Sequence, residues 1–141
     1  MNKNIKIALM KSGKSLWKSI PVLIGTLMLI SLIQSFIPSS FYVRIFNHGT
    51  VIDSLVGTII GSISAGNPLT SYVIGGELLK QNISLFAITA FLVSWVTVGL
   101  LQLPAESVIL GKDFAIKRNV SAFLLAILVA MTTVFIYKII L

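Results

Sequence analysis

Long hydrophobic runs, separated by short polar segments, occupy most of this chain. Three of the runs are each long enough to cross the hydrocarbon core of a bilayer as a helix: residues 20–37, 83–101 and 120–137. A fourth apolar stretch, residues 51–80, is broken in its middle by a Ser-Ala-Gly-Asn-Pro segment that ends at Pro68. The pattern predicts an all-α integral membrane protein with three full transmembrane helices and a broken re-entrant helical hairpin at 51–80.

The two arms of the predicted hairpin are helical runs at 51–66 and 68–79. Each arm would extend roughly 18–22 Å, whereas the hydrocarbon core is about 30 Å thick. Neither arm spans that core, so we expect the break between them to lie within the depth of the membrane. A Pro-kinked helix whose serines bond to their own carbonyls is the alternative interpretation.

The break carries the residue types of a solute-binding site. Asn67 can cap the second arm, and Pro68 at the first helical position lacks an amide that would otherwise remain unpaired. The next free amides would present the positive end of the helix dipole to the break. Uncharged donors and acceptors surround them: Ser62, Ser64, Asn67, Thr70 and Ser71. We expect this segment to bind a small polar or anionic solute, as broken helices do in many transporters.

Small residues at four-residue spacing form two stripes, which indicate close helix packing. The stripes comprise Gly57, Gly61 and Ala65 in the hairpin and Ala122, Ala126 and Ala130 in the last span. Such stripes can receive another helix of the same chain or a helix of a partner subunit.

The N-terminal segment, residues 1–18, carries five lysines and precedes a single transmembrane domain at 19–141. Its apolar residues fall on one side of a helix, which predicts an amphipathic interfacial helix on an anionic leaflet, ending near Pro21. A disordered basic leader is the alternative. A cleaved signal peptide is disfavoured, because no A-x-A site follows the long apolar run.

Composition and charge agree with a membrane location. The chain is 56% hydrophobic and 11% charged, whereas soluble domains carry about 25% charged residues. The net charge of +7 comes mainly from residues 1–18 and from the segment between Lys112 and Arg118. This placement orients membrane helices, so we expect a multi-pass protein of the cytoplasmic membrane with a cytoplasmic N-terminus and no nucleic-acid partner.

The basic residues also bear on the hairpin. A re-entrant 51–80 segment places eight basic residues on the cytoplasmic side and three outside, whereas a crossing at 51–66 gives seven and four. The positive-inside rule therefore favours the re-entrant arrangement.

Few residues indicate catalysis or metal binding, since the chain has no cysteine and one histidine, His48. Arg44 and His48 lie close in sequence to Asp53, which predicts local ion pairing, with a transport role for His48 as the alternative. Glu77 can pair with Lys80 at i,i+3 and is also a candidate for proton or ion coupling. We expect no enzymatic activity, no cofactor and no metal site.

Residues 102–118 are predicted to form a loop that contains a short helix from Pro104 to Gly111. Acidic and basic side chains of this loop are expected to form their own charge network. Asn119 would then cap the last span.

Several segments together resemble the prokaryotic predicted-permease family. The most specific is residues 57–79, GTIIGSISAGNPLTSYVIGGELL. Supporting segments follow in the same order and spacing: WVTVG at 95–99, QLPAE at 102–106, Gly111 and KRN at 117–119. The resemblance covers about two-thirds of the chain, from the broken segment to the last span, and implies a permease of the cytoplasmic membrane. This chain would be a half-size member, because longer relatives carry two such halves.

The resemblance also implies which residues matter. It implies a solute site at Ser64, Gly66, Asn67 and Pro68, with Glu77 and Glu106 as candidates for proton or ion coupling. Longer relatives include organoarsenical efflux permeases, and some carry a cysteine motif near their break. This chain has no cysteine, so arsenic and thiol-linked substrates are not transferred to it.

A half-size permease leaves the break without a facing partner, because repeats of transporters commonly meet at a midplane site. We therefore expect a homodimer or pairing with a second half-size permease. The alternative is a non-transporting membrane subunit or scaffold that pairs with another membrane protein. An intramembrane enzyme is a third and more distant class, since no nucleophile–base or paired-carboxylate arrangement is evident.

Overall fold

The computed structural model describes residues 3–36, 44–46, 48–64 and 66–140. Its contacts divide the chain into two units, Met1–Phe36 and Ile37–Leu141. The first unit contains helix α1 (Lys3–Phe36). The second contains the remaining labelled helices: α3 (Thr50–Ile63), α4 (Pro68–Lys80), α5 (Leu85–Thr97), α6 (Leu103–Leu110) and α7 (Lys112–Ile140).

Helix α1 joins two segments that the sequence analysis separated. The basic segment 1–18 and the predicted span 20–37 belong, over the described residues, to one helix of 34 residues with Pro21 inside it. The prediction that the basic helix ends near Pro21 is therefore wrong. Residue 37 and several side chains of the apolar half lie outside the described part.

The prediction of three full transmembrane helices is wrong, whereas the described residues do form an all-helical architecture. Among those residues, α7 is the one helix long and apolar enough to cross a membrane. The predicted span 83–101 forms only α5, whose 13 residues extend about 20 Å and fall short of the hydrocarbon core. The segment 20–37 belongs to α1 as far as residue 36, and α1 does not qualify over the residues that the structure describes.

Helix α7 begins earlier than the predicted span 120–137. Gly111, with a φ of 89°, ends α6, and α7 starts at the next residue, Lys112. The predicted short helix before Gly111 is thus present as α6, but residues 112–118 are helical and not a loop. Asn119 lies within the helix with a buried side chain, so its predicted role as the cap of the last span is wrong.

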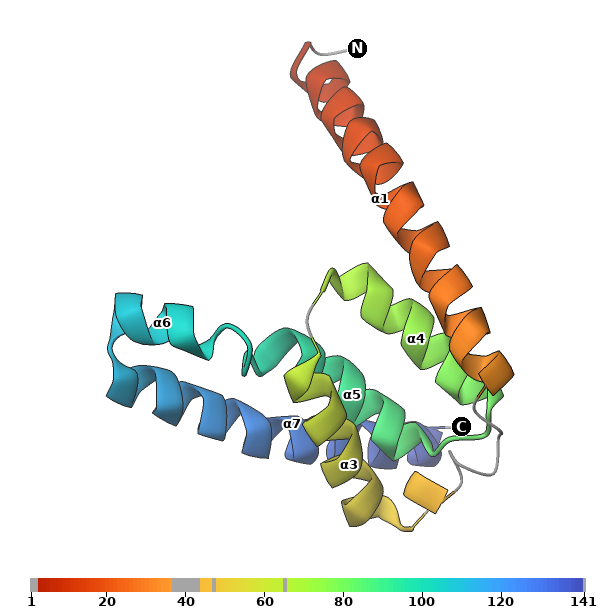
Figure 1. Cartoon of the computed structure of the whole chain (residues 1–141), viewed down its shortest axis with the longest axis vertical. Coiled ribbons are helices and arrows are strands. Elements are labelled where there is room, and N and C mark those ends of the chain that lie inside the picture. The colour runs from red at the N-terminus through yellow and green to blue at the C-terminus, as the bar shows by residue number, and fades with distance from the viewer. Residues whose placement is uncertain (1–2, 37–43, 47, 65, 141) are drawn as a thin grey trace. The chain divides into compact units, whose positions relative to one another are not determined.

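Helix α5 is central to the unit 37–141. Helix α3 crosses it in close contact, α4 lies beside it, and α7 packs against both α5 and α3 (Figure 1). Helices α6 and α7 run back along each other from the turn at Gly111 (Figure 1). An apolar cluster of Phe46, Ile83, Ala87 and Ile88 closes the end of the unit where α5 begins.

Helix α3 has an inverted polarity. Its face toward the protein interior consists of small and polar residues: Asp53, Ser54, Gly57, Thr58, Gly61 and Ser62. Its opposite face, at helical spacing, is apolar and exposed: Ile52, Leu55, Ile59 and Ile63. In water an amphipathic helix buries its apolar face, so the arrangement of α3 suits apolar surroundings.

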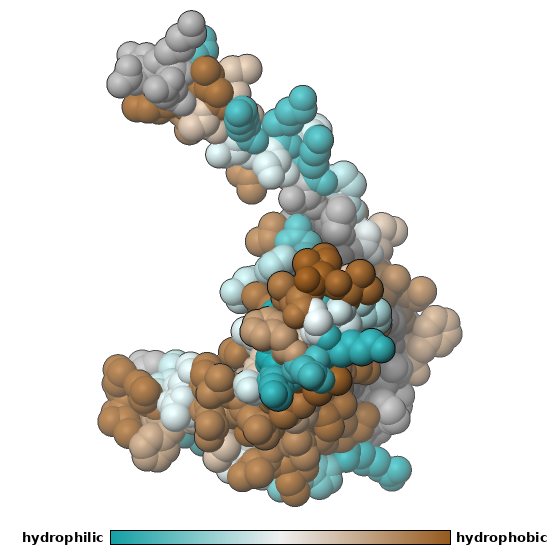
Figure 2. All heavy atoms as spheres, turned by 90° about the vertical axis from the view of Figure 1, so that its left-hand side faces the viewer, coloured by the Kyte–Doolittle hydropathy of each residue, from teal (hydrophilic) through white to brown (hydrophobic). Residues whose placement is uncertain are grey.

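The same inversion extends to α7. Only 17% of its most apolar window is buried, whereas the core helix of a soluble protein is mostly buried. The residues that α7 does bury include Ala126 and Ala130, while Leu124, Leu128 and Phe135 are exposed. Figure 2, in which the α6–α7 corner points toward the viewer, shows apolar side chains over much of this unit.

Candidate functional site

The candidate site is the break between α3 and α4. Helix α3 ends at Ile63, and α4 begins at Pro68 after the N-cap residue Asn67. The Asn67 side chain accepts a hydrogen bond from the Leu69 amide at 3.0 Å, and the Asn67 carbonyl accepts one from the Thr70 amide at 2.9 Å. The cap that the Asn-Pro pair predicts is therefore formed, and it engages two amides that we expected to be free.

The serine hydroxyls near the break donate to carbonyls of their own helices. Ser62 donates to Ile59 O at 2.8 Å, and Ser64 donates to Ile60 O at 2.7 Å. Ser71 likewise donates to Pro68 O at 2.7 Å. These bonds are those of the alternative interpretation, in which the serines satisfy themselves locally. Each hydroxyl oxygen keeps lone pairs that can accept a further hydrogen bond.

The predicted site residues differ in their accessibility. Gly66, Asn67 and Pro68 are exposed, and Ser64 and Thr70 are half-buried. Ser62 and Ser71 are buried against the rest of the unit. The structure therefore brings together an accessible break of Ser64, Gly66, Asn67 and Pro68, hereafter the α3–α4 break, with the other hydroxyls behind or beside it. Ala65 lies outside the described residues.

Trp95 adds a contact that the sequence analysis did not assign to the site. Its Nε1 on α5 donates to the carbonyl of Gly66 at 3.4 Å, across 29 residues of sequence. A Cβ on Gly66 would lie 3.2 Å from the Trp95 ring, and Phe91 packs edge-on against that ring. The indole therefore covers one side of the α3–α4 break, and no local spacing in the sequence could have indicated this.

The two carboxylates proposed for ion coupling lie in separate ion pairs. Glu77 pairs with Lys80 at 2.8 Å on α4, at the predicted i,i+3 spacing. Glu106 on α6 pairs with Arg118 and also accepts a hydrogen bond from Asn119 Nδ2 at 3.1 Å. Each carboxylate thus has a basic neighbour of its own.

Asn119 joins three segments at the opposite end of α5. Its Oδ1 accepts a hydrogen bond from the Gly99 amide at 2.8 Å, and its Nδ2 donates to Glu106 and to Ala115 O. Because the Asn119 side chain is buried, these bonds fix the segment after α5, helix α6 and helix α7 relative to one another. The segments QLPAE and KRN contribute Glu106 and Asn119 to this network.

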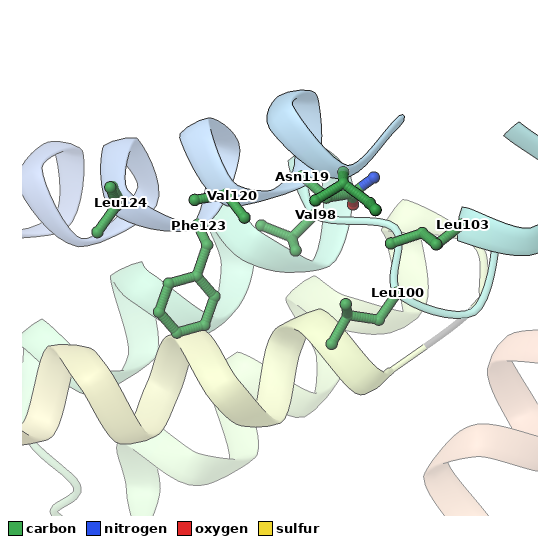
Figure 3. Close-up of a pocket in the computed structure, with 8 residues that line it drawn as sticks. Val98, Leu100, Leu103, Asn119, Val120, Phe123 and Leu124 are labelled. Atoms are coloured by element: carbon green, nitrogen blue, oxygen red, sulfur yellow. The ribbon is translucent and has the colours of Figure 1, made fainter. Parts of the chain in front are cut away.

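An apolar cavity of about 200 Å³ lies beside this network. Val98, Leu100 and Leu103 line it from the α5–α6 side, and Val120, Phe123 and Leu124 line it from α7 (Figure 3). The Asn119 amide also borders the cavity, but its polar atoms are engaged in the network. The cavity therefore presents carbon atoms.

The predicted packing stripes are used inside the chain. A Cβ at Gly57 would overlap the backbone of Ala87, and one at Gly61 would overlap Ser94 and the Phe91 carbonyl, so α3 and α5 meet at these glycines. Ala126 and Ala130 are buried and Ala122 is half-buried in the unit. A partner subunit would have to use other surfaces.

Asp53 is buried at the start of α3, where its Oδ1 accepts a hydrogen bond from the backbone amide of His48 at 2.9 Å. The described contacts thus place the main chain of His48 on this carboxylate, where we expected a side-chain ion pair with Arg44 or His48. In the part of the chain that the structure describes, no group of three or more His, Asp or Glu residues could hold a metal ion.

The fold and the break define the class: over the described residues, a small helical unit with a largely apolar exterior, an interior that mixes polar, small and larger apolar residues, and an interrupted helix. Comparison with protein-family models, curated proteins and solved structures gives no match to this chain. The resemblance to predicted permeases therefore stays a prediction.

Proposed function

We propose that this chain is a membrane-embedded half-unit of a permease that moves a small polar solute at the α3–α4 break. The observation that carries the proposal is an accessible, irregular backbone segment, Gly66–Pro68, within a largely apolar exterior. Non-helical backbone at membrane depth is tolerated only where it lines a water-filled cavity or is buried in protein, so this segment would need one of the two. A polar solute path satisfies that requirement.

The inverted polarity of α3 and α7 supports the membrane part of the proposal. Ile59 and Ile63 on α3 are 45% and 56% exposed, while Thr58 and Ser62 on the other face are buried. Lipid solvates the exposed face, and the small inner face lets helices approach closely. The basic residues at 1–18 and 112–118 support a cytoplasmic position for both segments, because cytoplasmic loops of membrane proteins are enriched in Lys and Arg.

The hydrogen bonds at the α3–α4 break favour an uncharged polar solute over an anion. An anion would need free amides at the start of α4. The amides of Leu69 and Thr70 are already bonded to Asn67. What remains accessible is the Asn67 amide group, the Gly66 main chain and the acceptor lone pairs of Ser64.

At Gly66, Trp95 is the contact from another helix of the unit that the structure records. The half-unit works in pairs, as a homodimer or with a second half-size permease. The small-residue stripes are already packed against other helices of the chain, at Gly57, Gly61, Ala126 and Ala130. The partner therefore contacts the exposed side of α3 and α4. Two breaks would then enclose the solute between them.

A second function is favoured by one specific observation. Ser62, Ser64 and Ser71 all donate their hydroxyl protons to carbonyls of their own helices. Such local satisfaction is what a kinked helix in a non-transporting scaffold would need. In that case a partner helix covers the α3–α4 break permanently and no solute passes.

Flux through purified protein in liposomes separates the two functions. Urea and glycerol serve as uncharged probes, and phosphate and chloride serve as anionic probes. We expect flux of an uncharged probe, abolished in Asn67→Leu. In Asn67→Ser the hydroxyl can still accept the Leu69 hydrogen bond, so this variant reports what the cap alone contributes.

A matched hydroxyl deletion controls for unspecific effects. Ser64→Ala removes a hydroxyl from the break, whereas Thr132→Val removes an equally back-bonded hydroxyl from the exposed side of α7. The proposal predicts that only the first changes flux. Absence of flux for all four probes, or full flux in Asn67→Leu, would leave the scaffold as the better description.

A further inference from the structure

Residues 98–124, hereafter the α6–α7 corner, contain an apolar cavity and exposed basic residues, which together suggest a lipid site. The cavity of about 200 Å³ lies between the segment after α5, helix α6 and the first turns of α7 (Figure 3). Its lining is buried at the base, where Val98 is 2% exposed, and accessible at the mouth, where Val120 is 55% exposed. A flexible chain can therefore enter from outside.

The chemistry of the cavity specifies an apolar occupant. The polar atoms of Asn119, which could otherwise bind a ligand, are engaged with Gly99, Glu106 and Ala115. A cavity lined by carbon does not hold ordered water, because water needs two to four polar partners. Hydrocarbon fills such a space favourably.

The register of α7 places positive charge at one end of the cavity. Lys112, Ile116, Val120 and Leu124 follow one another at four-residue spacing, and therefore lie along one side of the helix. Ile116, Val120 and Leu124 line the cavity, and Lys112 precedes them by one turn. In Figure 2, where this corner points toward the viewer, a hydrophilic patch lies beside apolar side chains.

The remaining charges of the rim leave this end basic. Arg118 is paired with Glu106, and Asp113 is the other acid within the segment 106–118. The two remaining positive charges belong to Lys112 and Lys117, which are both exposed. They outnumber the one remaining negative charge, that of Asp113. Basic pockets beside membrane helices on the cytoplasmic side are where anionic lipid headgroups bind.

We propose that the α6–α7 corner binds an anionic phospholipid, with an acyl chain in the apolar cavity and the phosphate beside Lys112 and Lys117. The inference uses the membrane placement of the proposed function but not solute transport. The lipid would stabilise the joint that Asn119 forms between the α5 end, α6 and α7.

The test measures lipid retention by native mass spectrometry of the purified chain in detergent. The probes are dioleoyl phosphatidylglycerol and dioleoyl phosphatidylcholine, which share acyl chains and differ in charge. We expect preferential binding of the anionic lipid. The Lys112→Gln/Lys117→Gln double variant should lose this preference, by about fivefold per lysine, since a basic residue near an anionic surface contributes about 1 kcal/mol.

Matched variants on the same helix serve as controls. Val120→Trp fills the mouth of the cavity and should weaken binding of both lipids, whereas Val129→Trp lies on α7 outside the cavity and should not. Lys138→Gln removes the same charge from the other end of α7 and should leave the preference unchanged. Far-UV circular dichroism verifies that each variant is folded.

Several results would overturn the lipid site. These are equal retention of the two lipids by the wild-type chain, an equal effect of Lys138→Gln, or unchanged binding in folded Val120→Trp. If Val120→Trp does not fold, the wild-type chain is compared with dihexanoyl phosphatidylglycerol and with glycerol 3-phosphate. Binding of these as strong as that of the dioleoyl lipid would exclude an acyl-chain site. Because the readout is lipid mass, failure of urea or glycerol flux leaves this result unaffected.

Discussion

The contact between α3 and α5 gives the most direct test of the inverted helix. Replacement of Gly57 by alanine would place a Cβ 2.9 Å from the carbonyl carbon of Ala87 and closer still to its oxygen, whereas ordinary contacts begin near 3.4 Å. The obstacle is backbone, so no side-chain rotation can relieve it. Helix α5 would have to move away from α3 along the face that holds Thr58 and Ser62.

The magnitude follows from comparing two Gly→Ala substitutions. Gly76 lies in α4, and a Cβ added there has nothing within 4 Å. Both variants gain the same helix propensity, up to about 1 kcal/mol, so their difference isolates the overpacking cost, about 1–3 kcal/mol. We expect Gly57→Ala to be less stable than Gly76→Ala by that amount.

The assay is unfolding by sodium dodecyl sulfate in mixed micelles, followed by far-UV circular dichroism. A second pair refines the geometry, because a Cβ at Gly61 would overlap the Ser94 hydroxyl and lie 2.5 Å from the Phe91 carbonyl oxygen. Ser94→Ala should therefore rescue part of the cost of Gly61→Ala and none of the cost of Gly57→Ala. Equal stabilities of Gly57→Ala and Gly76→Ala would refute the close approach of α3 to α5.

Two further predictions concern the joints at either end of α5. Asn119→Leu leaves the Gly99 amide without its hydrogen-bond acceptor. The variant should therefore lose about 1–3 kcal/mol of stability and show faster hydrogen exchange at the Gly99 amide. Unchanged exchange at Gly99 would exclude Asn119 as its acceptor in solution. Asn67→Ala removes the N-cap of α4 and should lower the free energy of unfolding by about 0.5–2 kcal/mol. Asn67→Asp keeps a side-chain acceptor and should retain most of that stability in the same unfolding assay. Equal losses of stability in the two variants would contradict the cap.

Local signals in the sequence were sufficient for the break and its cap. Asn67 and Pro68 form an N-cap and first turn from adjacent residues, and Gly111 adopts the positive φ that a helix stop often requires. Glu77 and Lys80 pair at the spacing that a helix imposes. Each of these features depends on residues within four positions of one another.

Helix ends that depend on distant residues were not predictable in this way. The apolar run 83–101 suggests one long span, but α5 ends at Thr97, and the Gly99 amide bonds to Asn119, 20 residues later. The charged segment 112–118 was predicted to be a loop, because charged side chains are expected outside the hydrocarbon core of the membrane. Charge does not indicate backbone conformation, and Lys and Arg are good helix formers.

The inverted polarity of α3 links the fold to the proposed pairing. The hydroxyls on its inner face donate to carbonyls of α3 itself, three or four residues earlier. The glycines on that face lie in close contact with α5. That face therefore has no room for a second subunit, although small-residue stripes often mark subunit contacts.

The face left for pairing is the apolar one of Ile59 and Ile63, which is continuous in sequence with Ser64 and the α3–α4 break. Under the proposed function, a partner that docks there would cover the exposed isoleucines and the α3–α4 break together, so pairing and solute access would depend on one surface. Bulky polar substitutions at Ile59 should therefore impair dimer formation and urea or glycerol flux in parallel, as seen by crosslinking and liposome assays, while the same change at Leu128 on α7 should affect neither. Dimers that persist in such a variant would move the subunit contact away from α3.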